Sequence, residues 1–227
     1  MMDSGYRTEV LSRIRNALRE VLTEPRTIPA GNATSEVVDK LGTFVTEFKK
    51  VDGEVLMAKS HSEVADYLVE IINLHKITKV AFSDSDVLEG IRLESELGRR
   101  LPEPVKMLRV DRTQKKGDLV PLLGDVGLGI TSCQFAIADT GTLVLTGERE
   151  RNRLLSLLPP IHVVVLYPHQ VLGSLTEVLA VDSERLDQTI TLVTGPSRTA
   201  DIELTLTKGV HGPREIHAIF LESAARD

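Results

Sequence analysis

Short apolar runs alternate with helical patterns in the first half of the chain, and this alternation constrains the fold more than any other feature. A short apolar run at 55–58 is the first expected strand, and the segments at 79–82 and 105–110 are the second and third. Between them, apolar residues recur at helical spacing. We expect one helix capped by Ser62, and a second capped by Asp84 or Asp86 that continues to Arg100. Strands that alternate with such helices form parallel sheets, so the sequence predicts an α/β fold with helices on both faces of a mainly parallel sheet.

The middle of the chain has a different pattern. Three apolar runs, at 126–131, 135–138 and 142–145, are separated only by turns and leave no room for helices. We expect this part to be a β-rich insertion that is antiparallel or irregular. The remaining expected elements are a strand at 161–166, a helix at 168–180 with Pro168 in its first turn, a strand at 189–193, and a strand at 216–221 that closes the sheet.

Two amphipathic helices are expected before this region. The first ends before Pro25, and the second begins at Ser35 and presents apolar residues as far as Phe48. Proline, glycine, asparagine and threonine between them indicate a linker. We therefore predict an N-terminal helical arm at 1–52 and an α/β domain at 53–227.

Composition excludes several classes of protein. The chain has 227 residues, with 27 Lys and Arg against 33 Asp and Glu, and the net charge of −6 disfavours nucleic-acid binding. A single cysteine, Cys133, excludes both an internal disulfide and a cysteine-ligated iron–sulfur cluster, and an inert buried thiol is its simplest interpretation. No apolar run is long enough to span a membrane, and the amphipathic start is unlike a signal peptide, so we expect a cytoplasmic protein.

The first candidate for chemistry is the turn at 138–142. Asp139, Thr140 and Thr142 supply a carboxylate and two hydroxyls, and Gly141 permits a positive φ or a close approach to a ligand. A simple hairpin turn closed by Asp and Gly explains the same residues.

The second candidate, 195–203, follows an expected strand and mixes glycine, hydroxyls, arginine and carboxylates. We expect it to start a helix whose free N–H groups bind a carboxylate or phosphate, with Arg198 as a clamp. Asp201 and Glu203 would favour the start of the helix or hold Arg198. A capped turn with a surface arginine is an equal alternative. The anion-binding candidates here are Gly195, Ser197, Arg198, Thr199 and Asp201.

Two further residues complete the candidate set. His211 lies between Gly209 and Gly212 and is a candidate general acid or base, although a structural histidine is the simpler interpretation. Arg153 abuts an apolar run and is the member of a mixed charge run most suited to face an anion. We find no zinc-like spacing of ligands and no dinucleotide or Walker fingerprint, so no metal site is predicted and no cofactor is identified.

The ordered set of these motifs resembles the LUD domain family of lactate utilisation protein C. The resemblance rests on the segments 129–131, 136–142, 158–159 with His162, 195–203 and 209–213. It implies a three-layer, Rossmann-like sandwich similar to the NagB/RpiA/CoA-transferase group. It also implies a role in the use of L-lactate, together with iron–sulfur lactate utilisation subunits. The family commonly has Glu where this chain has Asp139, which keeps the charge but shortens its reach.

Three hypotheses follow. The first is a component of an L-lactate-oxidising system that is not the redox subunit, binds a small carboxylate or an anionic cofactor, and docks on an iron–sulfur partner. The second is an enzyme for a phosphorylated sugar or CoA ester, with Asp139 or Glu203 as nucleophile or base and His211 as proton carrier. The third is a regulatory or structural module. The sequence leaves open both catalysis by the chain alone and assembly into a homo-oligomer.

The first two hypotheses need one geometric arrangement. The segments around Gly141, Arg198 and His211 must converge at one rim of the sheet, and in open α/β sheets we expect that rim at the carboxyl ends of the strands.

Overall fold

The computed structural model describes residues 8–13, 15–16, 37–111, 114, 116–146, 153–181, 190–200, 206–208 and 212–222. Contacts divide the chain into two compact units, Met1–Ser35 and Glu36–Asp227. The described residues of the first unit are helical, as expected there, and expose Val10 and Leu11. The rest of the expected first helix and the linker lie outside the described residues.

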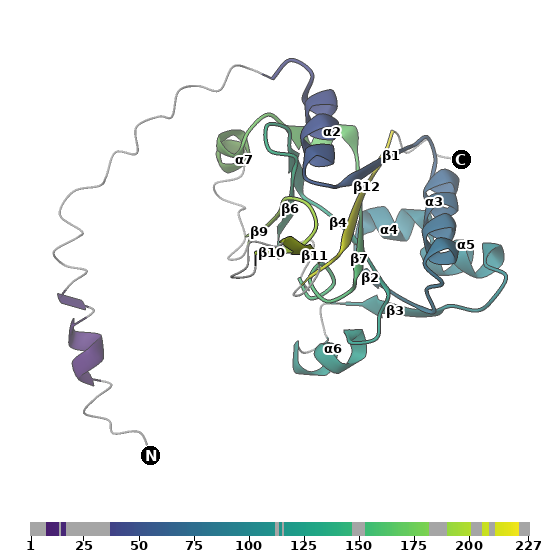
Figure 1. Cartoon of the computed structure of the whole chain (residues 1–227), viewed down its shortest axis with the longest axis horizontal. Coiled ribbons are helices and arrows are strands. Elements are labelled where there is room, and N and C mark those ends of the chain that lie inside the picture. Colours follow the sequence, from purple (N-terminus) through teal and green to yellow (C-terminus); the bar gives the residue numbers. More distant parts are fainter. Residues whose placement is uncertain are drawn as a thin grey trace. The chain divides into compact units, whose positions relative to one another are not determined.

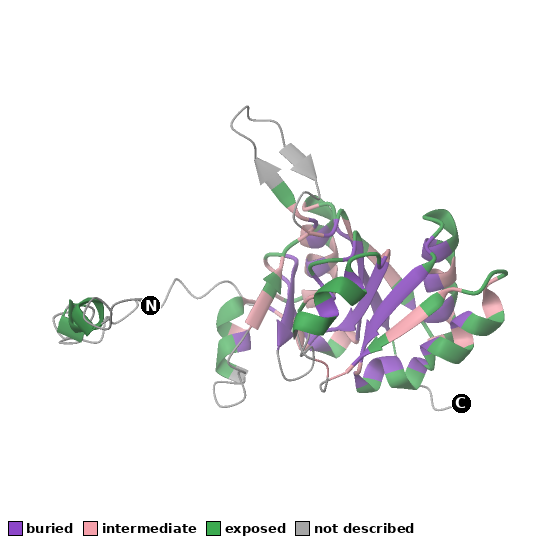
Figure 2. Ribbon diagram, turned by 90° about the horizontal axis from the view of Figure 1, so that it is seen from below, coloured by how far each residue is buried: buried purple, intermediate pink, exposed green. Residues whose placement is uncertain are grey.

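Six parallel strands form the main sheet of the larger unit (Figure 1). They are β1 (Glu54–Ala58), β2 (Lys79–Ser83), β3 (Lys106–Val110), β4 (Leu128–Ser132), β7 (Ile161–Leu166) and β12 (Glu215–Leu221). Their order across the sheet is β1-β12-β7-β4-β2-β3, and every neighbouring pair is parallel. Every residue of β2, β4 and β7 is buried, because both faces of a parallel sheet are covered (Figure 2). The α/β class and the parallel sheet are confirmed.

Helices α3 (His61–Leu74), α4 (Asp86–Ile91) and α5 (Leu93–Arg100) cover one face of this sheet. The cap of α3 is Ser60 and not Ser62, because the Ser60 side chain accepts a hydrogen bond from the Glu63 amide at 3.2 Å. The single helix expected up to Arg100 is two helices. The chain breaks at Arg92, whose left-handed conformation (φ 54°, ψ 50°) ends α4.

The other face carries α2 (Lys40–Lys50), α6 (Lys116–Leu123) and a second sheet. The second sheet has the order β8-β5-β6-β9, with β5 at Phe135–Ile137, β6 at Thr142–Thr146, β8 at Val171–Leu172 and β9 at Ile190–Val193. The rings of Phe44 and Phe48 stack at 5.1 Å, and Phe44 meets Phe220 of β12 edge-on at 5.5 Å. These contacts place α2 in the core, and the three-layer sandwich is confirmed.

Three expectations about the middle and end of the chain are wrong. The run at 126–131 is not part of the insertion, because β4 pairs in parallel with β2 and β7 in the main sheet. The expected helix at 168–180 is a 3₁₀ turn (Pro168–Gln170), the short strand β8, and α7 (Leu175–Val181), because the Gln170 side chain accepts from the Tyr167 amide and donates to the Cys133 carbonyl. Strand β12 lies inside the sheet between β1 and β7, so it does not close an edge.

The part of 195–203 that the structure describes, 195–200, is not helical, contrary to the expectation. Residues Arg198–Ala200 form β10, which pairs antiparallel with β11 (Leu206–Lys208) in a two-stranded ribbon. In the ladder of this ribbon, Arg198 pairs with Lys208, Thr199 with Thr207 and Ala200 with Leu206.

The larger compact unit begins before the boundary expected at residue 53. Helix α2 packs against β1 and β8 and supplies Phe44 and Phe48 to the core, so by its contacts it belongs with the α/β unit. The division at 52/53 stays a prediction. Within the described ranges, we find no helix that is long and apolar enough to cross a membrane.

Candidate functional site

Two of the three candidate segments are joined by hydroxyl groups. The Thr142 hydroxyl lies 2.9 Å from that of Thr140 and 2.8 Å from that of Thr194, which directly precedes Gly195. On the other side of Gly195, the Ser197 amide donates to the Pro213 carbonyl at 2.8 Å. The turn at 140–142, the segment at 194–198 and the start of the last described segment are therefore neighbours. His211 itself lies outside the described residues.

Two glycines allow this convergence. Gly141 has φ of +59° and Gly195 has φ of +79°, a region that other residues rarely adopt. A β-carbon at Gly141 would overlap the backbone at Phe48, and one at Gly195 would overlap the carbonyl oxygen of Val51. Both turns are thus packed directly on the end of α2 and the connection to β1.

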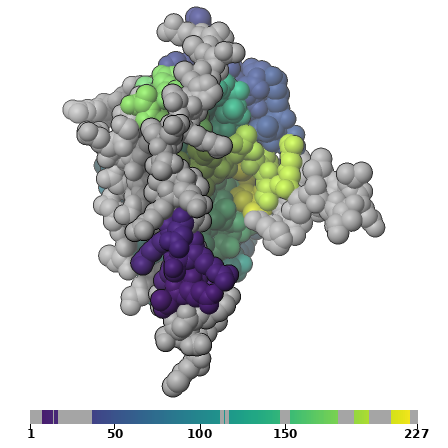
Figure 3. Space-filling model, turned by 90° about the vertical axis from the view of Figure 1, so that its left-hand side faces the viewer, coloured from purple at the N-terminus to yellow at the C-terminus, as the bar shows by residue number. Residues whose placement is uncertain are grey.

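The segments meet at the amino ends of the parallel strands, whereas we expected the carboxyl ends. The Arg214 amide donates to the Pro160 carbonyl at 2.7 Å, immediately before β12 and β7 begin. The expectation is wrong because the strands that these polar segments follow, β5 and β9, belong to the second sheet and not to the parallel one. Figure 3 shows the segment at 190–200 at the surface, beside the atoms of α2.

A cavity of about 510 Å³ opens at this amino edge. It is lined by Lys49, Asp52, Gly53, Glu54, Arg214, Glu215 and Ile216. Arg198 reaches its rim, where its guanidinium pairs with the Asp52 carboxylate at 2.8 Å. The ladder of the ribbon places Lys208 opposite Arg198. We call this the amino-edge cavity.

The amino-edge cavity is lined by carboxylates as well as cations, and its cations differ in whether they form ion pairs. Lys49 and Arg214 have no ion pair with any residue that the structure describes, and both are exposed. Arg198 is held by Asp52, so it contributes less free charge. Two cations without an ion pair to a described residue, at a concave surface, suit a small anion.

Two histidines lie beside Glu215, which lines this cavity. The Nε2 atoms of His75 and His217 lie 3.2 Å and 3.6 Å from the same carboxylate oxygen of Glu215. Burial lowers the pKa of the His217 imidazole, while the carboxylate of Glu215 opposes that shift. The sequence analysis did not single out these residues, because nothing in their spacing along the chain shows that they meet.

His162 of β7 is fully buried one strand away. Its register partner is Ile216, which lines the cavity, and partners in parallel strands point to the same face. Its Nε2 lies 2.9 Å from the Thr131 hydroxyl, and its Nδ1 has no hydrogen-bond partner within the described ranges. Burial, with the nearby His217, lowers the pKa of His162 to about 3, so the ring is neutral at physiological pH.

The remaining candidate residues stand apart or are not described. Asp139 is half-buried at the end of β5, where its amide donates to the Gly173 carbonyl at 3.2 Å, and its buried Oδ1 has no partner among the residues described. Arg153 is exposed, and no described contact joins it to the cavity. Asp201 and Glu203 lie outside the described residues, and only the backbone of Thr199 is described. The roles given to all these residues stay predictions.

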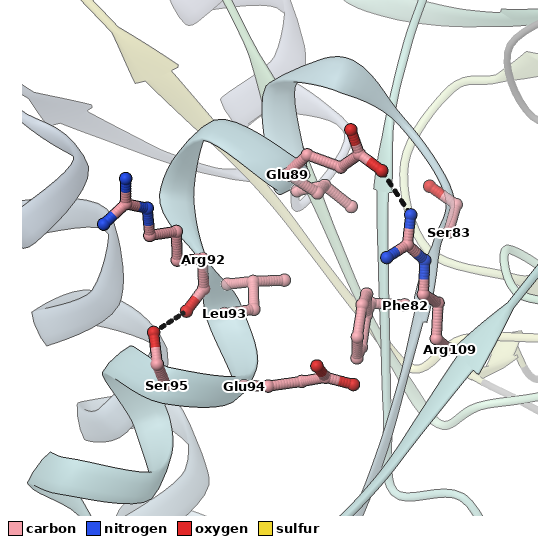
Figure 4. A pocket seen from close by; sticks show the side chains of 9 residues that line it. Phe82, Ser83, Glu89, Arg92, Leu93, Glu94, Ser95 and Arg109 are labelled. Carbon is pink, nitrogen blue, oxygen red and sulfur yellow. Dashed lines mark hydrogen bonds and ion pairs between the residues drawn. The ribbon is translucent and has the colours of Figure 1, made fainter. Parts of the chain in front are cut away.

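A second cavity, of about 360 Å³, does lie at the carboxyl end of β2 (Figure 4). It has an apolar floor that includes Phe82 and Leu93, with Glu94 directed toward the Phe82 ring. Arg109 lines it, but its guanidinium is paired with both Asp84 and Glu89, so little positive charge is available to a ligand. Sequence reasoning treated Asp84 only as a helix cap and did not find this cavity.

Comparison with known proteins identifies the family. A family model described as the LUD domain matches residues 41–221. The chain belongs to the LUD domain family. This LUD protein is 26% identical over 217 residues to lactate utilization protein C of Anoxybacillus flavithermus, covering 92% of this chain and 94% of the relative. It is 28% identical over 232 residues to the uncharacterized protein YkgG of Escherichia coli, covering 95% and 96%.

A solved structure supports the fold of this LUD protein. The crystal structure of a DUF162 family protein from Deinococcus radiodurans superimposes with a TM-score of 0.57 at 20% identity, covering 80% of this chain and 96% of that one. At this identity the likeness establishes the fold alone. Within the described residues, no group of three or more His, Cys, Asp or Glu side chains is arranged to hold a metal ion.

Proposed function

We propose that this LUD protein is a cytoplasmic component of an L-lactate-utilising system that binds a small carboxylate or another anion in the amino-edge cavity. The observation that carries the proposal is that Lys49 and Arg214 line this cavity, are exposed and form no ion pair with a described residue. The names of the full-length relatives supply the connection to lactate.

The redox step is assigned to another chain. Oxidation of lactate to pyruvate releases two electrons, which a cofactor must accept. Because the sequence printed here has one cysteine, a cysteine-ligated iron–sulfur cluster would have to be held by a partner. We therefore propose that this chain docks on an iron–sulfur subunit, as the family resemblance implies.

Calorimetric titration tests the binding site. We expect the purified chain to bind L-lactate, pyruvate or sulfate, and the Arg214→Ala and Lys49→Ala variants to bind at least tenfold more weakly, since a hydrogen bond to a charged group contributes about 1.5–3 kcal/mol. Lys50→Ala is the matched control, because Lys50 is the next residue of α2, pairs with Glu47 and does not line the cavity. Equal affinity in Arg214→Ala, Lys49→Ala and the parent would refute this site.

A second experiment tests the system. The tagged chain is recovered from cells grown on lactate, and its partners are identified by mass. We expect iron–sulfur subunits in the complex, and lactate oxidation with an artificial acceptor by the complex but not by the chain alone. Turnover of a sugar phosphate or a CoA ester by the isolated chain would instead favour an independent enzyme.

A further inference from the structure

Glu215 is the carboxylate of the amino-edge cavity that lies beside two imidazoles. Its Oε2 lies 3.2 Å from the Nε2 of His75, the residue directly after α3, and 3.6 Å from the Nε2 of His217, two positions further along β12. The Glu215 side chain is 44% exposed, against 28% for His75 and 12% for His217. The carboxylate therefore faces the cavity while the imidazoles approach it from the protein side.

The other charged groups around this wall come from every neighbouring element. Strand β1 contributes Glu54, which is the register partner of His217, and the end of α2 with its following turn contributes Lys49 and Asp52. The base of the ribbon contributes Arg198, β12 itself begins after Arg214, and His162 lies on the opposite face of the sheet. With neutral imidazoles, the three carboxylates Asp52, Glu54 and Glu215 offset the three cations Lys49, Arg198 and Arg214.

We propose that His75, His217 and Glu215 link anion binding in this cavity to proton uptake. When the two imidazoles are protonated, they neutralise Glu215, and the cations of the cavity then attract an anion more strongly. The inference rests on the proposed function, because it needs an anion in this cavity. By reciprocity, a bound anion promotes protonation of the imidazoles.

The direction of the effect follows from the local charges. Burial holds the pKa of His217 below its ordinary value, so this ring is neutral near neutral pH and has a proton to gain on acidification. Because the groups are partly exposed, the coupling is modest, and we expect about fivefold, the lower end of ordinary coupling between sites.

The experiment is calorimetric titration with sulfate and with L-lactate, whose charges do not change over the range, at about pH 8 and about pH 5.5, on either side of the ordinary imidazole value near 6.5. The parent should bind about fivefold more tightly at the lower pH. The Glu215→Gln variant should bind the anion tightly at both pH values. The double variant, His75→Gln with His217→Gln, should bind it weakly at both pH values. His169→Gln is the control, since this exposed histidine lies outside the cavity and should leave the pH dependence unchanged.

Proton uptake gives a second measurement that does not depend on the variants. Titration of the parent near pH 6.5 in two buffers with different ionisation enthalpies should show net uptake of protons on binding. Equal affinity at both pH values with no uptake overturns this inference but leaves the proposed function standing. An unchanged pH dependence in the double histidine variant also overturns it. Absence of binding at both pH values refutes the proposed function, and this inference with it.

Discussion

Replacement of Gly141 by alanine should destabilise the larger unit strongly. The left-handed conformation, at φ of +59°, costs a residue with a β-carbon about 1–2 kcal/mol. The new methyl group would also overlap the backbone at Phe48, and overpacking of this kind typically costs about 1–3 kcal/mol. We therefore expect a loss of about 2–5 kcal/mol in the free energy of unfolding, a large part of the roughly 5–15 kcal/mol that domains possess.

The assay is equilibrium unfolding in urea, with the circular dichroism signal as readout, and thermal unfolding as a second measurement. A loss of this size should lower the melting temperature by roughly 5–15 °C in a chain of this length. Gly98→Ala is the control, because a β-carbon there meets nothing within 4 Å and Gly98 lies within α5. That variant should gain about 0.5–1 kcal/mol. Equal stability of Gly141→Ala and the parent would refute the tight packing of this turn on α2.

Three further predictions concern single residues. The pKa of His162 is about 3 in the folded chain and about 6.5 in the unfolded chain. Between these two pH values, His162 is therefore protonated only in the unfolded chain. Stability should therefore fall by up to about 1.4 kcal/mol per pH unit as the pH drops below about 6.5, and His162→Gln should show a shallower slope in urea titrations at several pH values. Cys133 is fully buried, so a thiol reagent should label it only at the rate of unfolding, and fast labelling of the native chain would contradict this burial. Arg92 has a left-handed backbone at the end of α4, which glycine adopts without strain, so Arg92→Gly should keep or raise the free energy of unfolding by up to about 1 kcal/mol. A clear loss of stability in thermal melts would show that the Arg92 side chain matters more than its backbone.

The strands of the main sheet were largely predictable because they are buried on both faces. Runs such as 80–82 and 163–166 are continuously apolar, and such runs are typical of parallel strands. The sheet to which a run belongs was not predictable. The run at 126–131 resembles its neighbours in length and composition, and only pairing with β2 and β7, far away in sequence, places it in the main sheet. Helix breaks were missed for a related reason, since Arg92 carries no signal of its left-handed backbone.

The candidate site was predictable in part. The positive φ expected as one possibility at Gly141 is present, but the close approaches at Gly141 and Gly195 are to the backbone at the end of α2, which the sequence did not indicate. The ionic groups of the cavity could not be found in this way. Lys49 ends a helix and Arg214 precedes a strand, and each is an ordinary surface cation in its local sequence. Only the parallel pairing of β1, β12 and β7 brings the two together.

The position of the site at the amino edge follows from how the second sheet is attached. Strand β6 pairs antiparallel with β9, so the start of β6 at Thr142 and the end of β9 at Val193 lie at the same end of that sheet. Helix α2 runs directly into β1, and its last turn receives both Gly141 and Gly195. The end of α2 is therefore the point where the second sheet is fastened to the main one, and it coincides with the amino ends of β1 and β12. In an open α/β sheet the carboxyl-end crevice is the usual ligand site because its loops are free to vary. In this protein, Lys49 and Arg214, which form no ion pair with a described residue, line the cavity at the amino ends of the strands. In the cavity at the carboxyl end, Arg109 is already paired with two carboxylates.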